Sequence, residues 1–121
     1  MAFLGNADTA GCCRYVAATA NLFNQTVTAG ATDWLEIVGM PHVRVVINMT
    51  GGPAPAAPGW LLQVAMRGDG GILTIPTSVP ILALNTPITE TFPAIAGTRV
   101  RVLPDTAGGQ TYTISIMAAA S

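Results

Sequence analysis

The chain has 121 residues, enough for one hydrophobic core, and its formal net charge is −1. Half of the residues are hydrophobic and only 9% are charged, against a share of about 25% in typical soluble domains. The five arginines are scattered and there is no lysine, so no basic stripe predicts nucleic-acid binding, and no apolar run approaches the ~20 residues of a membrane-spanning helix.

The N-terminal segment lacks the alternation of apolar and polar residues that marks the rest of the chain. We expect residues 1–22 to form an arm that orders on a neighbouring molecule, with the large apolar side chains of Phe3, Leu4 and Tyr15 as its anchors. Residues 16–22 are rich in alanine and leave open one helical turn or a loop. The segment has neither the basic start nor the apolar stretch of a secretion signal, so we expect the protein to be made and assembled in the cytoplasm.

Cys12 and Cys13 are the only cysteines and are neighbours in the chain. A bridge between adjacent residues would be strained, and two thiols without further ligands make no zinc site. Two hypotheses remain: both thiols stay reduced, or they cross-link neighbouring subunits once the assembly meets an oxidising exterior.

From residue 23 onward, short apolar stretches are separated by turns rich in glycine and proline. In residues 43–49, for example, every second side chain is apolar, which is typical of a strand with one buried face. The segments predicted to be strands are residues 33–38, 43–49, 60–67, 72–75, 98–103 and 110–117, with residues 23–28, 81–84 and 88–92 as further candidates. Their spacing predicts one all-β domain over residues 23–121, an antiparallel β-sandwich, jelly-roll or immunoglobulin-like, of about 6–8 strands.

Three loops stand out between these segments. Residues 50–59 are stiffened by proline and should project from the sandwich, and residues 104–109 predict a hairpin loop between the last two strands. The glycine-rich residues 68–71 predict a tight turn. Asp69 lies there within an Arg-Gly-Asp tripeptide, which resembles an adhesive motif, but turn formation explains the same residues.

No residue pattern predicts catalysis. His42, the only histidine, has no nucleophile motif or acidic partner near it in the sequence, and the carboxylates are isolated. We therefore expect no enzyme activity, no catalytic or metal-binding residues and no cofactor. Trp34 and Trp60 each begin a strand, and core packing explains them better than stacking on a sugar.

The C-terminal half carries a resemblance to a known group. A strand at residues 60–67 that ends in a Gly-Asp-Gly turn, a later Arg-Val-Arg-Val strand at residues 99–102 and a final threonine-rich strand at residues 111–116 resemble small β-sandwich structural proteins of tailed bacteriophages. Ile72 stands where that group has an aromatic residue. The resemblance covers residues 31–118, and within the group the capsid decoration (cement) proteins are the most similar in size, low charge and N-terminal arm.

The resemblance implies a homotrimer on the capsid surface of the virion, assembled in the host cytoplasm and bound to the major capsid protein. Val46 and Leu61, apolar residues on the second faces of their strands, are then the predicted subunit contacts. The low charge supports such an assembly, because a surface short of charge is typical of one covered by neighbours. The alternatives are a neutral surface of threonine, serine and asparagine on an unassembled protein, a carbohydrate-binding or adhesive module that uses Trp34, Trp60 and the turn at residues 68–71, and another phage head or tail component.

Overall fold

A computed structural model describes residues 20–66 and 71–120, and within them the chain forms strands and no helix. The predicted arm therefore lies almost entirely outside the described residues, together with Cys12, Cys13 and the Arg-Gly-Asp turn. The strands are β1 (Ala20–Val27), β2 (Leu35–Glu36), β3 (His42–Gly51), β4 (Trp60–Ala65), β5 (Ile72–Ile75), β6 (Ile88–Phe92), β7 (Arg99–Pro104) and β8 (Thr111–Ala119).

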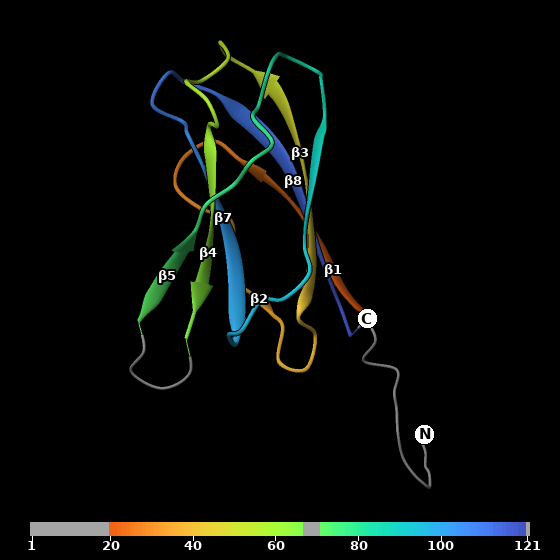
Figure 1. The fold of residues 1–121 in the computed structure, drawn as a ribbon. Coiled ribbons are helices and arrows are strands. Elements are labelled where there is room, and N and C mark those ends of the chain that lie inside the picture. The colour runs from red at the N-terminus through yellow and green to blue at the C-terminus, as the bar shows by residue number, and fades with distance from the viewer. Residues whose placement is uncertain (1–19, 67–70, 121) are drawn as a thin grey trace, which may run out of the picture.

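The eight strands form two antiparallel four-stranded sheets that pack face to face (Figure 1). Sheet A has the order β1-β8-β3-β6 and sheet B the order β2-β7-β4-β5. Strands 1 and 8, 2 and 7, 3 and 6, and 4 and 5 are all neighbours, so the chain is one long double-stranded hairpin wrapped around a core. This strand order is that of a jelly roll, and it confirms the predicted sandwich.

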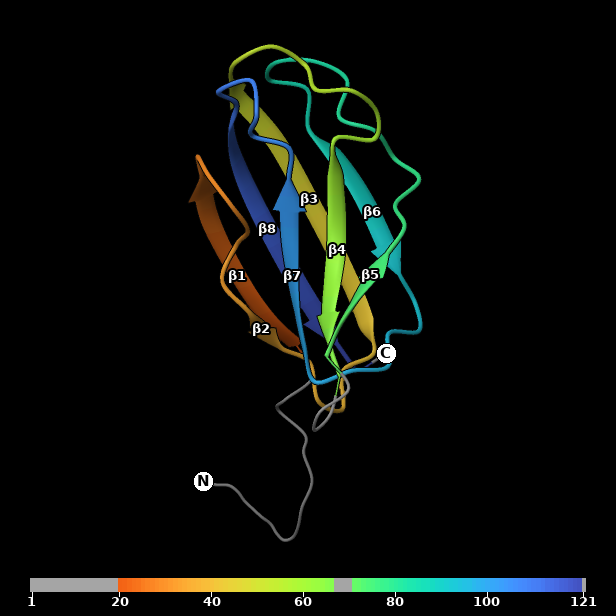
Figure 2. The ribbon, with the colours of Figure 1, turned by 90° about the vertical axis from the view of Figure 1, so that its left-hand side faces the viewer.

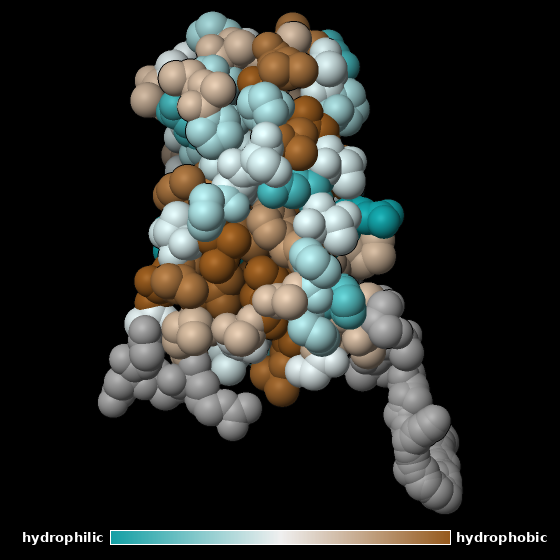
Figure 3. All heavy atoms as spheres, in the orientation of Figure 1, coloured by the Kyte–Doolittle hydropathy of each residue, from teal (hydrophilic) through white to brown (hydrophobic). Residues whose placement is uncertain are grey.

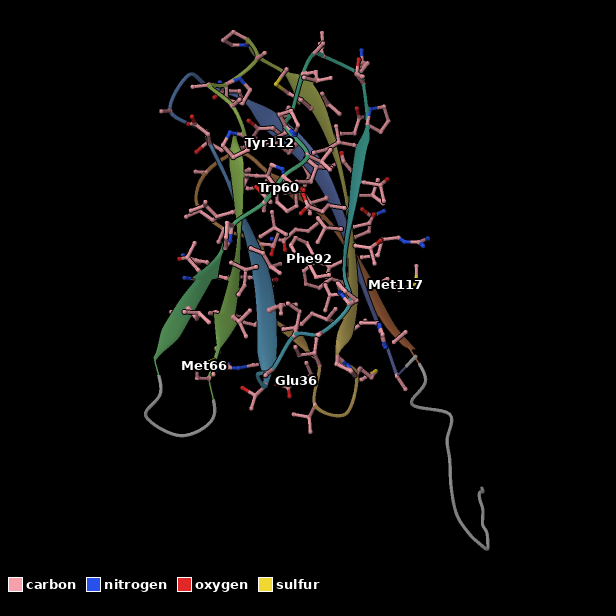
Figure 4. All side chains as sticks on the ribbon, in the orientation of Figure 1. Glu36, Trp60, Met66, Phe92, Tyr112 and Met117 are labelled. Carbon is pink, nitrogen blue, oxygen red and sulfur yellow. The ribbon has the colours of Figure 1, made fainter. Side chains whose placement is uncertain are left out.

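The core between the sheets is filled by every second residue of the long strands. In β3 the predicted inward residues Val43, Val45, Ile47 and Met49 are all buried, and β8 adds Tyr112, Ile114, Ile116 and Ala118. The outer residues of the same strands are exposed or half-buried, which is the alternation expected of a sandwich with solvent on its outer faces. Figure 4 shows Trp60, Phe92 and Tyr112 between the two sheets.

The two edge strands of sheet A, β1 and β6, each have a polar residue among their inward-facing side chains. Gln25 of β1 lies opposite the buried Ile114, and its side-chain oxygen accepts a hydrogen bond of 2.8 Å from the backbone N–H of Asp33. Glu90 of β6 lies opposite the buried Val45, and its carboxylate accepts hydrogen bonds from the loop between β5 and β6. These two side chains tie the crossing loops to the sheet where a sandwich would otherwise leave backbone N–H groups unsatisfied.

Four details of the chain differ from the sequence-based expectation. β1 begins at Ala20, before the expected domain start at residue 23, and β2 has only two residues. Residues 81–84 form no strand, although the Ile81 side chain is buried. Residues 104–109 do not close a hairpin, because β7 belongs to sheet B and β8 to sheet A, so this loop crosses between the sheets.

That crossing loop is held by Tyr112. Its hydroxyl donates a hydrogen bond of 2.6 Å to the backbone carbonyl of Asp105. Burial of the side chain, with a smaller contribution from the negative charge of Asp105, raises the pKa of Tyr112 to about 12. The neutral hydroxyl is therefore the form that fits the fold.

We expect the stability of the protein to fall between pH 10 and 12 because of Tyr112. The unfolded chain loses this proton near pH 10 and the folded chain only near pH 12, so the unfolded state binds fewer protons in this range. The free energy of unfolding relative to Tyr112→Phe should then drop most steeply between pH 10 and 12, by up to about 1.4 kcal/mol per pH unit, as measured by urea unfolding at pH 9, 10, 11 and 12. Parallel pH profiles of the two proteins would contradict this assignment.

A second prediction concerns Glu90. Its carboxylate accepts hydrogen bonds from the N–H groups of Ser78 and Val79, at 3.0 and 2.9 Å, and from the Ser78 hydroxyl at 3.2 Å. Glu90→Ala should lower the free energy of unfolding by about 1–3 kcal/mol and speed hydrogen exchange of these two amides. The control is Thr91→Ala, an exposed neighbour in β6, which should leave both amides protected.

Candidate interaction surface

One edge of sheet B carries two large exposed apolar side chains. β5 is the edge strand, and its Ile72 and Leu73 side chains are 54% and 50% exposed. Figure 3 shows hydrophobic side chains gathered at the lower left of the molecule, where Figure 1 places β5. We call the edge formed by Ile72–Ile75 the β5 edge.

The two exposed side chains of the β5 edge point to opposite faces of sheet B. Leu73 lies opposite the buried Val64, so it continues the inward-facing row of the sheet. Ile72 lies opposite Ala65 and therefore belongs to the outer face. Leu73 is therefore the last inward-facing side chain in its row across sheet B, and no described strand lies beyond it.

The β5 edge also has backbone groups that point away from the sheet. The N–H of Met66, just after β4, donates a hydrogen bond to the carbonyl of Gly71, which lies opposite it just before β5. Met66 and Gly71 are therefore a hydrogen-bonded pair at the end of the antiparallel ladder. Pairs alternate along an antiparallel ladder, and the groups of Ile72 and Thr74 consequently point to the free side. Ala65, opposite Ile72, confirms the alternation, because its carbonyl accepts from Thr98 on the other side of β4.

Natural proteins usually protect such an edge with lysine, proline or inward-pointing charge. The β5 edge has none of these within Ile72–Ile75. On sheet A, by contrast, the edge strand β6 carries Glu90 in its inward row and has Pro87 and Pro93 just beyond its two ends. β1, the other edge of sheet A, likewise has no lysine, proline or charged residue, and Pro76 follows β5 as Pro93 follows β6. What marks the β5 edge is the exposure of Ile72 and Leu73.

The outer face of sheet A is polar but almost uncharged. Its residues are mainly threonine, serine and asparagine, and the Ser115 hydroxyl donates to the Asn24 side chain at 3.0 Å. Arg44 is the charged residue of this face, and it lines a shallow depression of about 340 Å³ together with His42, Thr91 and Met117. Figure 4 places Met117 on the outer side of this sheet.

The outer face of sheet B holds one aromatic cluster. The Arg101 guanidinium lies 4.4 Å from the centroid of the Trp34 ring, and that of Arg99 lies 5.3 Å away. Arg101 is further fixed by a hydrogen bond of 2.8 Å from its Nε to Gln63. Cation–π contacts therefore cover part of the Trp34 ring.

The sequence-predicted contact residues do not form one surface. Val46 lies on the outer face of sheet A and Leu61 on the outer face of sheet B, so the two half-buried side chains point to opposite sides of the sandwich. The predicted anchors Phe3, Leu4 and Tyr15 lie outside the described residues. The β5 edge was not predicted as a contact surface. The sequence does contain a signal for it, because four uncharged residues lie between a glycine-rich turn and Pro76.

Trp60 is a core residue, as the packing interpretation predicted, and the sugar-stacking alternative for it is wrong. The ring is 2% exposed and makes an edge-to-face contact with Phe92 at a centroid distance of 6.1 Å. Its indole N–H donates a hydrogen bond of 2.7 Å to the carbonyl of Val79. A buried and hydrogen-bonded indole has no free face for a sugar.

Within residues 20–66 and 71–120, no three side chains of histidine, cysteine, aspartate or glutamate are placed to bind a metal ion. The same part of the chain contains no helix that is long and apolar enough to cross a membrane.

No protein-family model and no curated protein matches the chain. Among solved structures, the chain is similar to a protein of Bacillus endospore appendages, which form a family of disulfide-linked pili. The sequence identity is 13%, the similarity covers 94% of this chain and 100% of that chain, and the TM-score is 0.34. At this level the similarity supports no conclusion about the function of this chain.

If the exposed side chains of the β5 edge bind a partner, they should contribute little to the stability of the isolated domain. A matched pair of leucine substitutions tests this. Leu62→Ala removes a side chain with no exposed surface and should cost about 2–5 kcal/mol of unfolding free energy. Leu73→Ala removes the same atoms from a half-exposed position on the neighbouring strand and should cost less than about 1.5 kcal/mol. Urea unfolding at low protein concentration compares the two, and equal losses would show that Leu73 is a core residue.

Proposed function

We propose that the protein is a structural subunit of a larger assembly, and specifically a capsid decoration protein that stabilises an assembled shell. In this proposal it sits on the outer surface of a virion, binds the major capsid protein and other copies of itself, and bridges neighbouring subunits. A trimer is the expected form of the self-assembly. The resemblance to structural proteins of tailed bacteriophages is the source of the finer part of the proposal.

The observation that carries the proposal is a surplus of apolar side chains outside a filled core. Val38, Leu82, Leu84 and Met117 are 37–64% exposed, in addition to Ile72 and Leu73 of the β5 edge. The core row of Val, Ile, Leu and Tyr side chains is buried without them. Exposed apolar side chains that lie next to one another, as Ile72 and Leu73 do, are typical of a surface that partners cover.

Charge supports the same conclusion. The charged side chains within the described residues are Asp33, Glu36, Arg44, Glu90, Arg99, Arg101 and Asp105. Several of these are engaged inside the domain, since Glu90 binds a loop and two arginines stack on Trp34. A surface with so little free charge has a low cost of desolvation when a neighbour covers it.

A decoration protein needs no chemistry to act. A protein that binds the assembled shell but not its dissociated subunits stabilises the shell by mass action. The N-terminal segment supplies the proposed contacts, with Phe3, Leu4 and Tyr15 buried against neighbouring subunits. Cys12 and Cys13, on the same segment, would then lie close enough to neighbouring subunits to cross-link them under oxidising conditions.

Co-sedimentation with expanded shells tests the proposal. The full chain should pellet with the shells, whereas a variant that lacks residues 2–15 should stay in the supernatant while its urea unfolding is unchanged, because all eight described strands begin at or after Ala20. Thr91→Ala, which changes an exposed polar side chain of the domain, is the control and should pellet with the shells as the full chain does. Equal pelleting of the full and the shortened chain would contradict the role of the arm, and a full chain that remains in the supernatant would contradict the decoration function itself.

A further inference from the structure

We propose that the β5 edge is the binding site for residues 1–4 of a second copy of the chain, which add a fifth strand to sheet B. This inference rests on the proposed function, because it names where the N-terminal segment of one subunit binds on the next. It assigns a role to an edge that has both backbone groups on its free side and exposed apolar side chains.

The backbone of the β5 edge is arranged for strand addition. Ile72 and Thr74 each point a backbone N–H and a carbonyl away from β4, as the Met66–Gly71 hydrogen bond requires. An added extended segment would satisfy these groups, and main-chain hydrogen bonds of this kind provide the affinity in strand-addition complexes.

The side chains of residues 1–4 complement those of the edge. Phe3 and Leu4 are consecutive, so in an extended segment they point to opposite faces of the sheet. Leu73 and Ile72 are consecutive as well and are exposed on opposite faces. One added strand can therefore cover both exposed side chains at once, and its inward residue would prolong the core row that ends at Leu73.

Charge does not oppose this pairing. Residues 1–7 have no charged side chain, and neither does Ile72–Ile75. A neutral segment loses little hydration energy when it pairs with a neutral edge, whereas a lysine or glutamate at either place would have to be desolvated.

The arrangement of the sheets favours a second copy over the same molecule as the donor. β1, from which the segment departs, is at one edge of sheet A, and β5 is at the opposite side of the sandwich in sheet B (Figure 2). The segment would have to cross the end of its own sandwich to reach its own β5 edge. Residues 1–19 precede Ala20, and an extended chain of that length spans up to about 60 Å.

A complementation experiment with two full-length variants tests the proposal. Thr74→Pro removes an N–H from the free side of β5, where edge proline is tolerated, and keeps the arm intact. The double variant Phe3→Ser, Leu4→Ser keeps the edge and removes the two apolar anchors. Sedimentation at high concentration should show that the wild-type protein self-associates, that each variant alone stays monomeric, and that the mixture forms a 1:1 complex, because only one donor and one acceptor remain.

Ile72→Lys is a second edge variant, in case Thr74→Pro lowers the stability of the domain, and it should likewise stay monomeric. Thr91→Ala, at an exposed position of β6 in the other sheet, is the control and should self-associate as the wild type does. If the edge variants still self-associate while the arm variant does not, the arm binds elsewhere and the inference is wrong, although an arm-mediated assembly survives. A wild-type chain that stays monomeric in solution but pellets with shells would also overturn the inference and leave the proposed function standing.

Discussion

Two sheets that pack face to face leave two open sides between their edge strands, and closing these sides with hydrogen bonds is the constraint on which the rest of this sandwich depends. Gln25 and Glu90 meet it by placing polar groups in inward-facing rows that are otherwise apolar. Each accepts backbone N–H groups of a loop that crosses its side. Thr32 adds to the first side, since it exchanges hydrogen bonds with Val102 of β7.

The closure is incomplete at β5. The loop held by Glu90 brings Val79 against the core, yet Leu73 in the same inward direction stays half-exposed. The core is filled without Leu73, and no described strand pairs with the outer side of β5. The surface therefore has an exposed apolar edge at this place. The proposed strand addition would satisfy the free backbone groups of Ile72 and Thr74 and cover the exposed side chains of Ile72 and Leu73 at the same time.

Much of the domain could be predicted from local patterns. Alternation is directly visible in β3 and β8, where the inner residues are apolar and the outer ones mostly polar, and so the buried faces of both strands were predicted correctly. The loop at residues 104–109 was not, because a glycine-rich turn looks the same whether the strands on its two sides pair or belong to different sheets. Val46 and Leu61 show the same limit: each was correctly placed on an outer face, but the sequence does not say that these faces point in opposite directions.

By itself the sequence determined an antiparallel sandwich, the alternation of its core strands and a surface short of charge, since these depend on residue type and on a period of two. Only the tertiary structure decided the jelly-roll order, the hydrogen bonds of Gln25 and Glu90 to distant loops, and the free edge at β5. These features depend on which strands become neighbours, and that choice is made by packing between residues far apart in the chain.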